Sequence, residues 1–136
     1  MKQTFDTDSI LYKVINSTTG ITSVLTGGVY VGERPLNSTL EDIVINTITL
    51  TQDYLPQLGA SNVNIYVTDV NATIKGVTQK VANRARLSQL SSLVLDALRA
   101  ARITGLKWSI SSMNTIQEAD ISQHYVNIRI DWNINN

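Results

Sequence analysis

The chain has 136 residues, the usual length of one domain, and its 43% of hydrophobic residues suffice for a core. It has no cysteine, which excludes disulfides, thiolate nucleophiles and cysteine-based zinc sites. Its formal net charge is zero, which argues against a dedicated nucleic-acid-binding protein. Only 16% of its residues are charged, and a surface with few charges opposes association only weakly. The N-terminal residues mix charges without an apolar run, and no segment reaches the roughly 20 apolar residues of a membrane span. We therefore expect a soluble intracellular protein with no membrane partner.

The charges are unevenly distributed along the chain. Residues 75–107 hold seven cations and a single acid, Asp96, so this segment is +6 and the rest of the chain is −6. The cations are Lys75, Lys80, Arg84, Arg86, Arg99, Arg102 and Lys107. Such an asymmetry favours self-association, because a basic strip on one copy can meet an acidic region on the next. The alternative interpretation is a solvated helix face with no partner.

The first half of the chain predicts one helix and three strands. A helix over 8–16 has apolar residues at helical spacing, and Asp6 or Asp8 can cap its N-terminus. Strands are predicted over 29–34, 43–51 and 62–70, where Val63, Ile65 and Val67 alternate with polar residues. The segments 35–42 and 52–61 read as loops because they contain Pro35 and Pro56. The segment 71–83 reads as a loop or an early helical turn.

The second half predicts a long helix and two strands. A helix is predicted from about 84 to 103, with an apolar stripe and with Gly105 placed to end it. Its stripe consists of Leu87, Leu90, Val94, Leu98 and Ala101. In a strand over 108–116, we expect Trp108, Ile110 and Ile116 to share one face. The last strand, within HYVNIRIDWNI at 124–134, alternates throughout and predicts a sheet with one buried and one polar face.

These elements indicate a single α+β domain over residues 1–136. Its order is α-β-β-β-α-β-β, and the two final strands are expected to form an antiparallel hairpin. The simplest architecture is an antiparallel or mixed sheet whose apolar face is covered by both helices.

The sequence contains no constellation typical of catalysis or of metal or cofactor binding. His124 is the only histidine, and a lone histidine at the start of a strand is usually structural. The carboxylate pairs Glu41–Asp42, Glu118–Asp120 and Asp6–Asp8 lie in predicted loops or caps rather than on rigid elements. Gly27–Gly28 fits no phosphate-binding motif and is expected to form the turn into a strand. We expect a protein that is not an enzyme and has no cofactor.

The element order resembles a family of tailed bacteriophages, the tail terminator or tail-completion proteins and their neck-ring relatives. The resemblance is carried by Gly28-Val29-Tyr30 after an N-terminal helix, a loop with Pro35, NVNIYVTDV, a helix of the type RLSQLSSLVLDAL, and two closing strands that end in HYVNIRIDWNI. It covers nearly the whole chain but is one of pattern, without an invariant motif. The segments 31–42 and 70–83 depart from the family pattern and are candidate interface arms.

The resemblance implies a virion protein that is assembled in the cytoplasm of a bacterial host. It would form a homo-oligomeric ring of six or twelve copies at the head–tail junction of a long- or short-tailed phage. The ring would join head-completion or portal proteins to the tail, and genomic DNA would pass through its lumen with only non-specific contacts. Ring contacts of this kind are heterologous.

Two regions are the candidate subunit interface. One is the loop with Gly32, Glu33, Arg34, Glu41 and Asp42, and the other is the basic face with Lys80, Arg84, Arg86 and Arg102. Charge reversal at Arg84 and Arg86 is expected to weaken oligomerisation in a salt-sensitive way. The alternatives are a small protein-binding adaptor module of a bacterial cell, and an enzyme with an unrecognised site.

Overall fold

The computed structural model describes all 136 residues and confirms the α+β class. The elements are, in chain order, α1 (Thr4–Asn16), α2 (Thr19–Thr22), β1 (Val29–Val31), β2 (Asp42–Leu50), β3 (Gln57–Thr68), β4 (Val70–Ile74), β5 (Val77–Val81), α3 (Arg84–Ala100), β6 (Leu106–Glu118), the short 3-10 helix η1 (Ala119–Ile121) and β7 (Gln123–Ile134).

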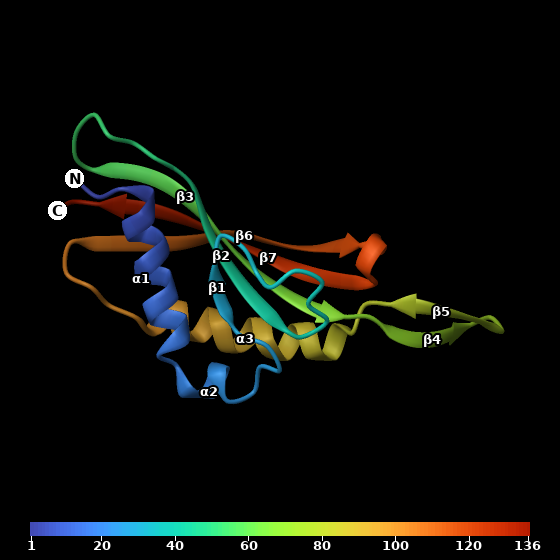
Figure 1. Ribbon diagram of the computed structural model, residues 1–136. Coiled ribbons are helices and arrows are strands. Elements are labelled where there is room, and N and C mark those ends of the chain that lie inside the picture. Colours follow the sequence, from blue (N-terminus) through green and yellow to red (C-terminus); the bar gives the residue numbers. More distant parts are fainter.

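Five strands form one sheet in the order β1-β2-β3-β7-β6, in which only the β1–β2 pair is parallel. The helices lie on one face of this sheet (Figure 1). Strands β4 and β5 form a separate two-stranded hairpin, residues 70–81, which we call the arm. Figure 1 shows both chain termini at one end of the molecule and the arm projecting from the other.

The core lies between the sheet and the helices, as the alternation predicts. In β7, Val126, Ile128, Ile130, Trp132 and Ile134 are all buried. They lie beside the buried residues of β3 in the same sheet. Both strands face the stripe of α3 that consists of Leu87, Leu90, Val94 and Leu98. Each such side chain stabilises the fold by about 1.5–3 kcal/mol relative to exposure.

Four polar side chains inside this core form a chain of hydrogen bonds. The indole of Trp132 donates to Ser61 Oγ at 2.8 Å, and Ser61 Oγ shares a hydrogen bond with Thr47 Oγ1 at 2.7 Å. Thr47 Oγ1 in turn shares one with Thr7 Oγ1 of α1, also at 2.7 Å. This chain of hydrogen bonds fixes α1 against the sheet, since a buried hydroxyl without a partner would cost about 1–3 kcal/mol.

The first helix begins at Thr4, four residues earlier than the predicted 8–16. Asp6 accepts a hydrogen bond from Gln3 N at 2.7 Å and so supports the N-terminus from within the first turn. Of the two predicted capping residues, Asp6 therefore has this role and Asp8 does not. The Asp8 side chain points into the protein and accepts from Thr47 N at 2.7 Å, which ties α1 to β2.

The segment 71–83 is not a loop or a helical turn, because most of it belongs to the arm. Lys75 and Gly76 form its tip with φ of 48° and 80°. Two consecutive residues with positive φ match the right-handed twist of a hairpin. Strand β3 also begins at Gln57, inside the segment predicted as a loop.

The predicted face of β6 is correct only for its first half. The pairing with β7 shifts between Ile110 and Ser112, where a bulge inserts one residue. Trp108 and Ile110 face the helices, but after the bulge Ile116 pairs with Tyr125 on the opposite, polar face. The inward positions after the bulge are Met113 and Thr115, which the simple alternation places outside.

Candidate assembly surface

Three of the residues considered for catalysis, His124, Glu41 and Asp42, have side-chain partners within the chain. His124 Nδ1 lies 2.5 Å from a carboxylate oxygen of the buried Asp69, and no hydroxyl hydrogen-bonds to either side chain. Glu41 and Asp42 point to different partners, Arg86 and Ser38. No group of three or more His, Asp or Glu side chains lies within reach of a common metal ion. The His124–Asp69 pair instead joins β7 to the base of the arm.

Arg34 and Asp42, two of the nine predicted interface residues, pair with each other. The Arg34 guanidinium lies 4.0 Å above the ring of Tyr66 and donates to Ser38 O at 3.1 Å. It lies 3.5 Å from the carboxylate of Asp42, which is 1% exposed. Arg34 therefore fastens the segment 31–42 over the polar face of the sheet.

Glu41 and Arg86 form a second internal pair, between that segment and α3. Arg86 donates to both Glu41 carboxylate oxygens, at 2.6 and 2.7 Å, and to Val24 O at 2.5 Å. The hydrogen bond from Arg86 lowers the pKa of Glu41 from its ordinary 4.5, and burial only partly opposes it. The same contact raises the pKa of Arg86. Both charges are therefore satisfied within one chain.

The other five predicted interface residues reach the surface. Gly32 has a φ of 79° and no atom near the position of a Cβ, and Glu33 beside it is exposed. Lys80 is exposed on the arm, and Arg84 is exposed in the first turn of α3. Arg102 follows the end of α3 and donates to Arg99 O and Ala101 O. The structure therefore does not gather the nine residues into one surface.

The outer edge of β6 is the largest unpaired feature of the main sheet. This strand has 13 residues and pairs only with β7. No charged residue occurs between Lys107 and Glu118, and every residue from Ser111 to Gln117 is exposed. Soluble proteins usually protect such an edge with charges, proline or a covering segment, because its free N–H and C=O groups pair readily with another chain. Sequence reasoning missed this surface, since only the strand order reveals which strand lies at the edge.

A groove of about 220 Å³ runs beside this edge, between β6 and the N-terminal half of α3. Its apolar lining consists of Leu87, Leu95, Met113 and Val126. Ser91 also lines the groove, and its hydroxyl is buried without a hydrogen-bond partner. Met113 is 48% exposed although it lies on the inward face of the sheet. Edge and groove together leave apolar and hydrogen-bonding groups available on one side of the molecule.

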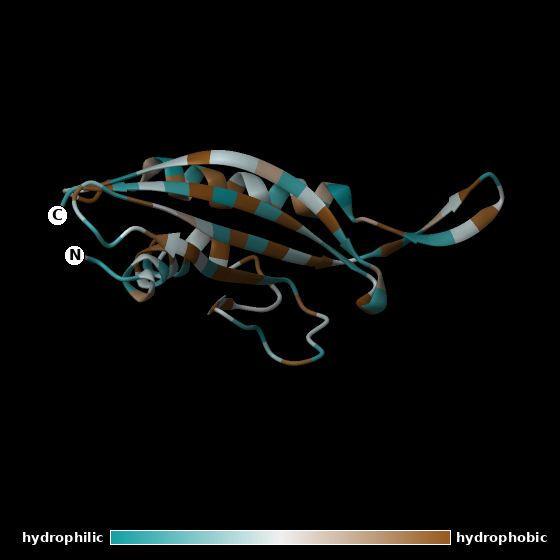
Figure 2. Cartoon of the chain, turned by 90° about the horizontal axis from the view of Figure 1, so that it is seen from above, coloured by the Kyte–Doolittle hydropathy of each residue, from teal (hydrophilic) through white to brown (hydrophobic).

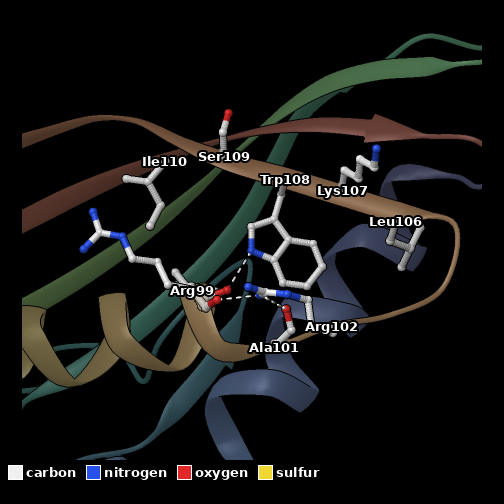
Figure 3. A pocket seen from close by; sticks show the side chains of 9 residues that line it. Arg99, Ala101, Arg102, Leu106, Lys107, Trp108, Ser109 and Ile110 are labelled. Atoms are coloured by element: carbon white, nitrogen blue, oxygen red, sulfur yellow. Dashed lines mark hydrogen bonds between the residues drawn. The ribbon is translucent and has the colours of Figure 1, made fainter.

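A basic hollow lies at the other end of α3. Figure 3 shows Trp108 directed toward the helix end, where its indole donates to Leu98 O at 3.0 Å. The hollow, about 450 Å³, is also lined by Arg99, Arg102 and Lys107 and by no acid. The contacts of Arg102 with the last carbonyls of α3 make it a helix cap. The other two cations that line the hollow, Arg99 and Lys107, have no acid among the lining residues.

Neither a protein-family model nor a curated protein sequence matches the chain. None of its helices combines the length and the hydropathy that crossing a membrane would require.

Proposed function

We propose that this chain is a non-catalytic structural protein whose copies assemble into a closed ring. The observation that carries the proposal is the unpaired edge of β6, with 13 residues and no charge in its interior. Such an edge is stable in solution when a further strand covers it. With no catalytic cluster at His124 or at the carboxylate pairs, assembly explains more of the surface than turnover does.

The place of this ring, the head–tail junction of a tailed bacteriophage, rests on the resemblance in element order. The ring would connect head-completion or portal proteins to the tail, with DNA passing through its lumen. The basic hollow with Arg99, Arg102 and Lys107 offers cations for non-specific contact with phosphates or with acidic neighbours. This location is tested by mass spectrometry of purified phage particles. Absence of the chain from particles produced by a host that expresses it would contradict the location.

Assembly into a ring is tested by a substitution that introduces a charge on the inward face of the edge strand β6. Met113→Lys places a cation beside the groove, where the native side chain is 48% exposed, so the monomer should fold normally. We expect sedimentation analysis to show loss of the oligomer. Asn133→Lys is the matched control, because Asn133 is exposed on β7, away from the free edge. Equal oligomer formation by both variants would contradict assembly through β6.

An adaptor module is the second candidate, favoured by the same edge. An extended segment of another protein can add to an unpaired strand through main-chain hydrogen bonds. The two functions differ in what the purified protein does alone. A ring protein forms oligomers without a partner, whereas an adaptor remains monomeric and recovers a host protein from lysate through an interaction that Met113→Lys abolishes.

A further inference from the structure

The arm has one apolar face and one polar face. Residues directly opposite each other in an antiparallel pair share a face. The pairs Val70–Val81, Ala72–Gln79 and Ile74–Val77 therefore line one side, and Asn71–Lys80 and Thr73–Thr78 line the other. Five of the six residues on the first side are apolar. The polar side is closed by a hydrogen bond between the Thr73 and Thr78 hydroxyls at 3.0 Å.

Most of this apolar face is exposed in the single chain. Val70, Ile74 and Val77 are 41%, 50% and 60% exposed. The side-chain hydrogen bonds of the arm stay within the arm, and Figure 2 shows it extending well beyond the end of the sheet, with apolar positions along both strands. An isolated two-stranded hairpin is marginally stable in water, and it becomes stable when its apolar face packs against something else.

We propose that the arm of one copy docks on the β6 edge of a second copy of this chain, where it extends the sheet. Its apolar face then continues the inward face of β6 and covers Met113 and the groove beside α3. This inference rests on the proposed function, since it names the contact through which the ring closes.

Three features of the chain favour a second copy as the occupant. The arm is short, with five residues in each strand, and the edge has 13, so the arm fits within its length. The only charges on the arm are Lys75 and Lys80, whereas β6 ends near the acids Glu118 and Asp120. The net charge of zero also leaves no overall repulsion between copies.

The geometry of this contact is heterologous. The arm and the β6 edge are different surfaces, so each copy has one donor and one acceptor. Such contacts do not stop at a two-fold dimer; they close into a ring or continue as a filament.

The absence of native cysteine allows a direct test by cross-linking. The double variant Gln79→Cys/Thr115→Cys has one thiol on the apolar side of the arm and one on the inward side of β6. With a short bis-maleimide, we expect a ladder of covalent multimers on a denaturing gel. The single variants should stop at dimers. The control Gln79→Cys/Lys13→Cys moves the second thiol to the exposed face of α1 and should give no ladder.

Shortening the arm provides the second measurement. Replacing residues 71–80 by Asn-Gly removes a segment whose side-chain hydrogen bonds are all internal, so the circular dichroism of the main sheet and its unfolding midpoint should persist. We expect association to weaken by at least about tenfold. Two results would contradict the arm contact while the ring proposal stands. One is a shortened variant that assembles like the wild type. The other is a double-cysteine variant that forms an oligomer of wild-type size but gives no cross-linked ladder. A wild-type chain that stays monomeric overturns both.

Discussion

At the scale of single residues, two ion pairs hold the segment between β1 and β2 in place. Arg34 forms an ion pair with Asp42, and Arg86 of α3 donates two hydrogen bonds to Glu41. Four of the nine predicted interface residues thus serve the fold of one chain. Charge reversal at Arg86 therefore tests the fold, and only reversal at Arg84 tests association.

Truncation of Arg86 should destabilise the monomer. Arg86→Ala leaves the Glu41 carboxylate and Val24 O without their donor, at a cost of about 2 kcal/mol. Arg84→Ala, two residues away and exposed, should change the free energy of unfolding by less than about 0.5 kcal/mol. Urea denaturation measures both, and similar midpoints for the two variants would show that the Glu41 pair contributes little.

The same pair predicts how stability depends on pH. The pKa of Glu41 is lower in the folded chain than its ordinary 4.5, chiefly because Arg86 hydrogen-bonds to the charged form. Its contribution to stability is therefore complete above pH 4.5 and is lost as the pH falls through the lower folded-state pKa. Glu41→Gln should be less stable than the wild type at pH 7.

The difference in unfolding free energy between these two proteins should shrink below pH 4.5. Urea titrations at pH 7 and at several acidic values measure it. A difference that stays constant with pH would mean that the charge of Glu41 has no part in it.

At the scale of elements, the entry into β1 is shaped by a close approach. A Cβ on Gly27 would lie 2.0 Å from Asp42 Oδ1 and 2.5 Å from Glu41 O, so the chain has no room for a side chain there. Gly28 N donates to Asp42 Oδ1 at 3.1 Å. The turn at Gly27–Gly28, which the sequence predicts, therefore also brings the backbone of these glycines into contact with the start of β2.

Gly27→Ala should destabilise the protein by about 1–3 kcal/mol, because overpacking forces the start of β2 to move. Gly20→Ala is the matched control, since Gly20 lies in α2 with open space around its Cβ position. That control should be neutral or slightly stabilising, because alanine favours a helix by up to about 1 kcal/mol over glycine. Equal melting temperatures for the two variants would contradict the close approach.

Elements with a strong apolar period were predictable from the sequence. The alternation in β7 and the stripe of α3 from Leu87 to Leu98 indicate the buried faces correctly, because the core imposes the period of each element. The helix was predicted to about residue 103 but ends at Ala100, so Ala101 does not belong to the stripe. The first half of β6 was also placed correctly, but the bulge near Ser111 reverses the faces that follow it. A bulge leaves no mark in the residue types of a strand. The spacing of Trp108, Ile110 and Ile116 therefore cannot show that the faces reverse between Ile110 and Ile116.

The assembly surface was harder to predict than the core. The arm turns at Lys75–Gly76 rather than at a common Asn-Gly pair, and its two strands have only five residues each, so the strand signal is weak. The exposure of the β6 edge depends on the order of strands distant in sequence. Likewise, the pairing of Arg86 with Glu41 joins residues 45 positions apart, which a charge count along the chain does not detect.

At the scale of the whole molecule, the arm and the β6 edge are separate, unpartnered surfaces of a chain with no net charge. The arm projects from the end opposite the termini, so docking on a neighbour leaves both termini free (Figure 1). A contact of this heterologous type passes from copy to copy and ends only when the ring closes.

The central claim is that the chain forms a closed ring. Native mass spectrometry of the purified wild-type protein over a range of concentrations tests it most directly. The account predicts one dominant species whose mass is a whole multiple of the 15.0 kDa chain, six or twelve copies if the phage resemblance holds. A species of 15.0 kDa alone at every concentration would contradict it.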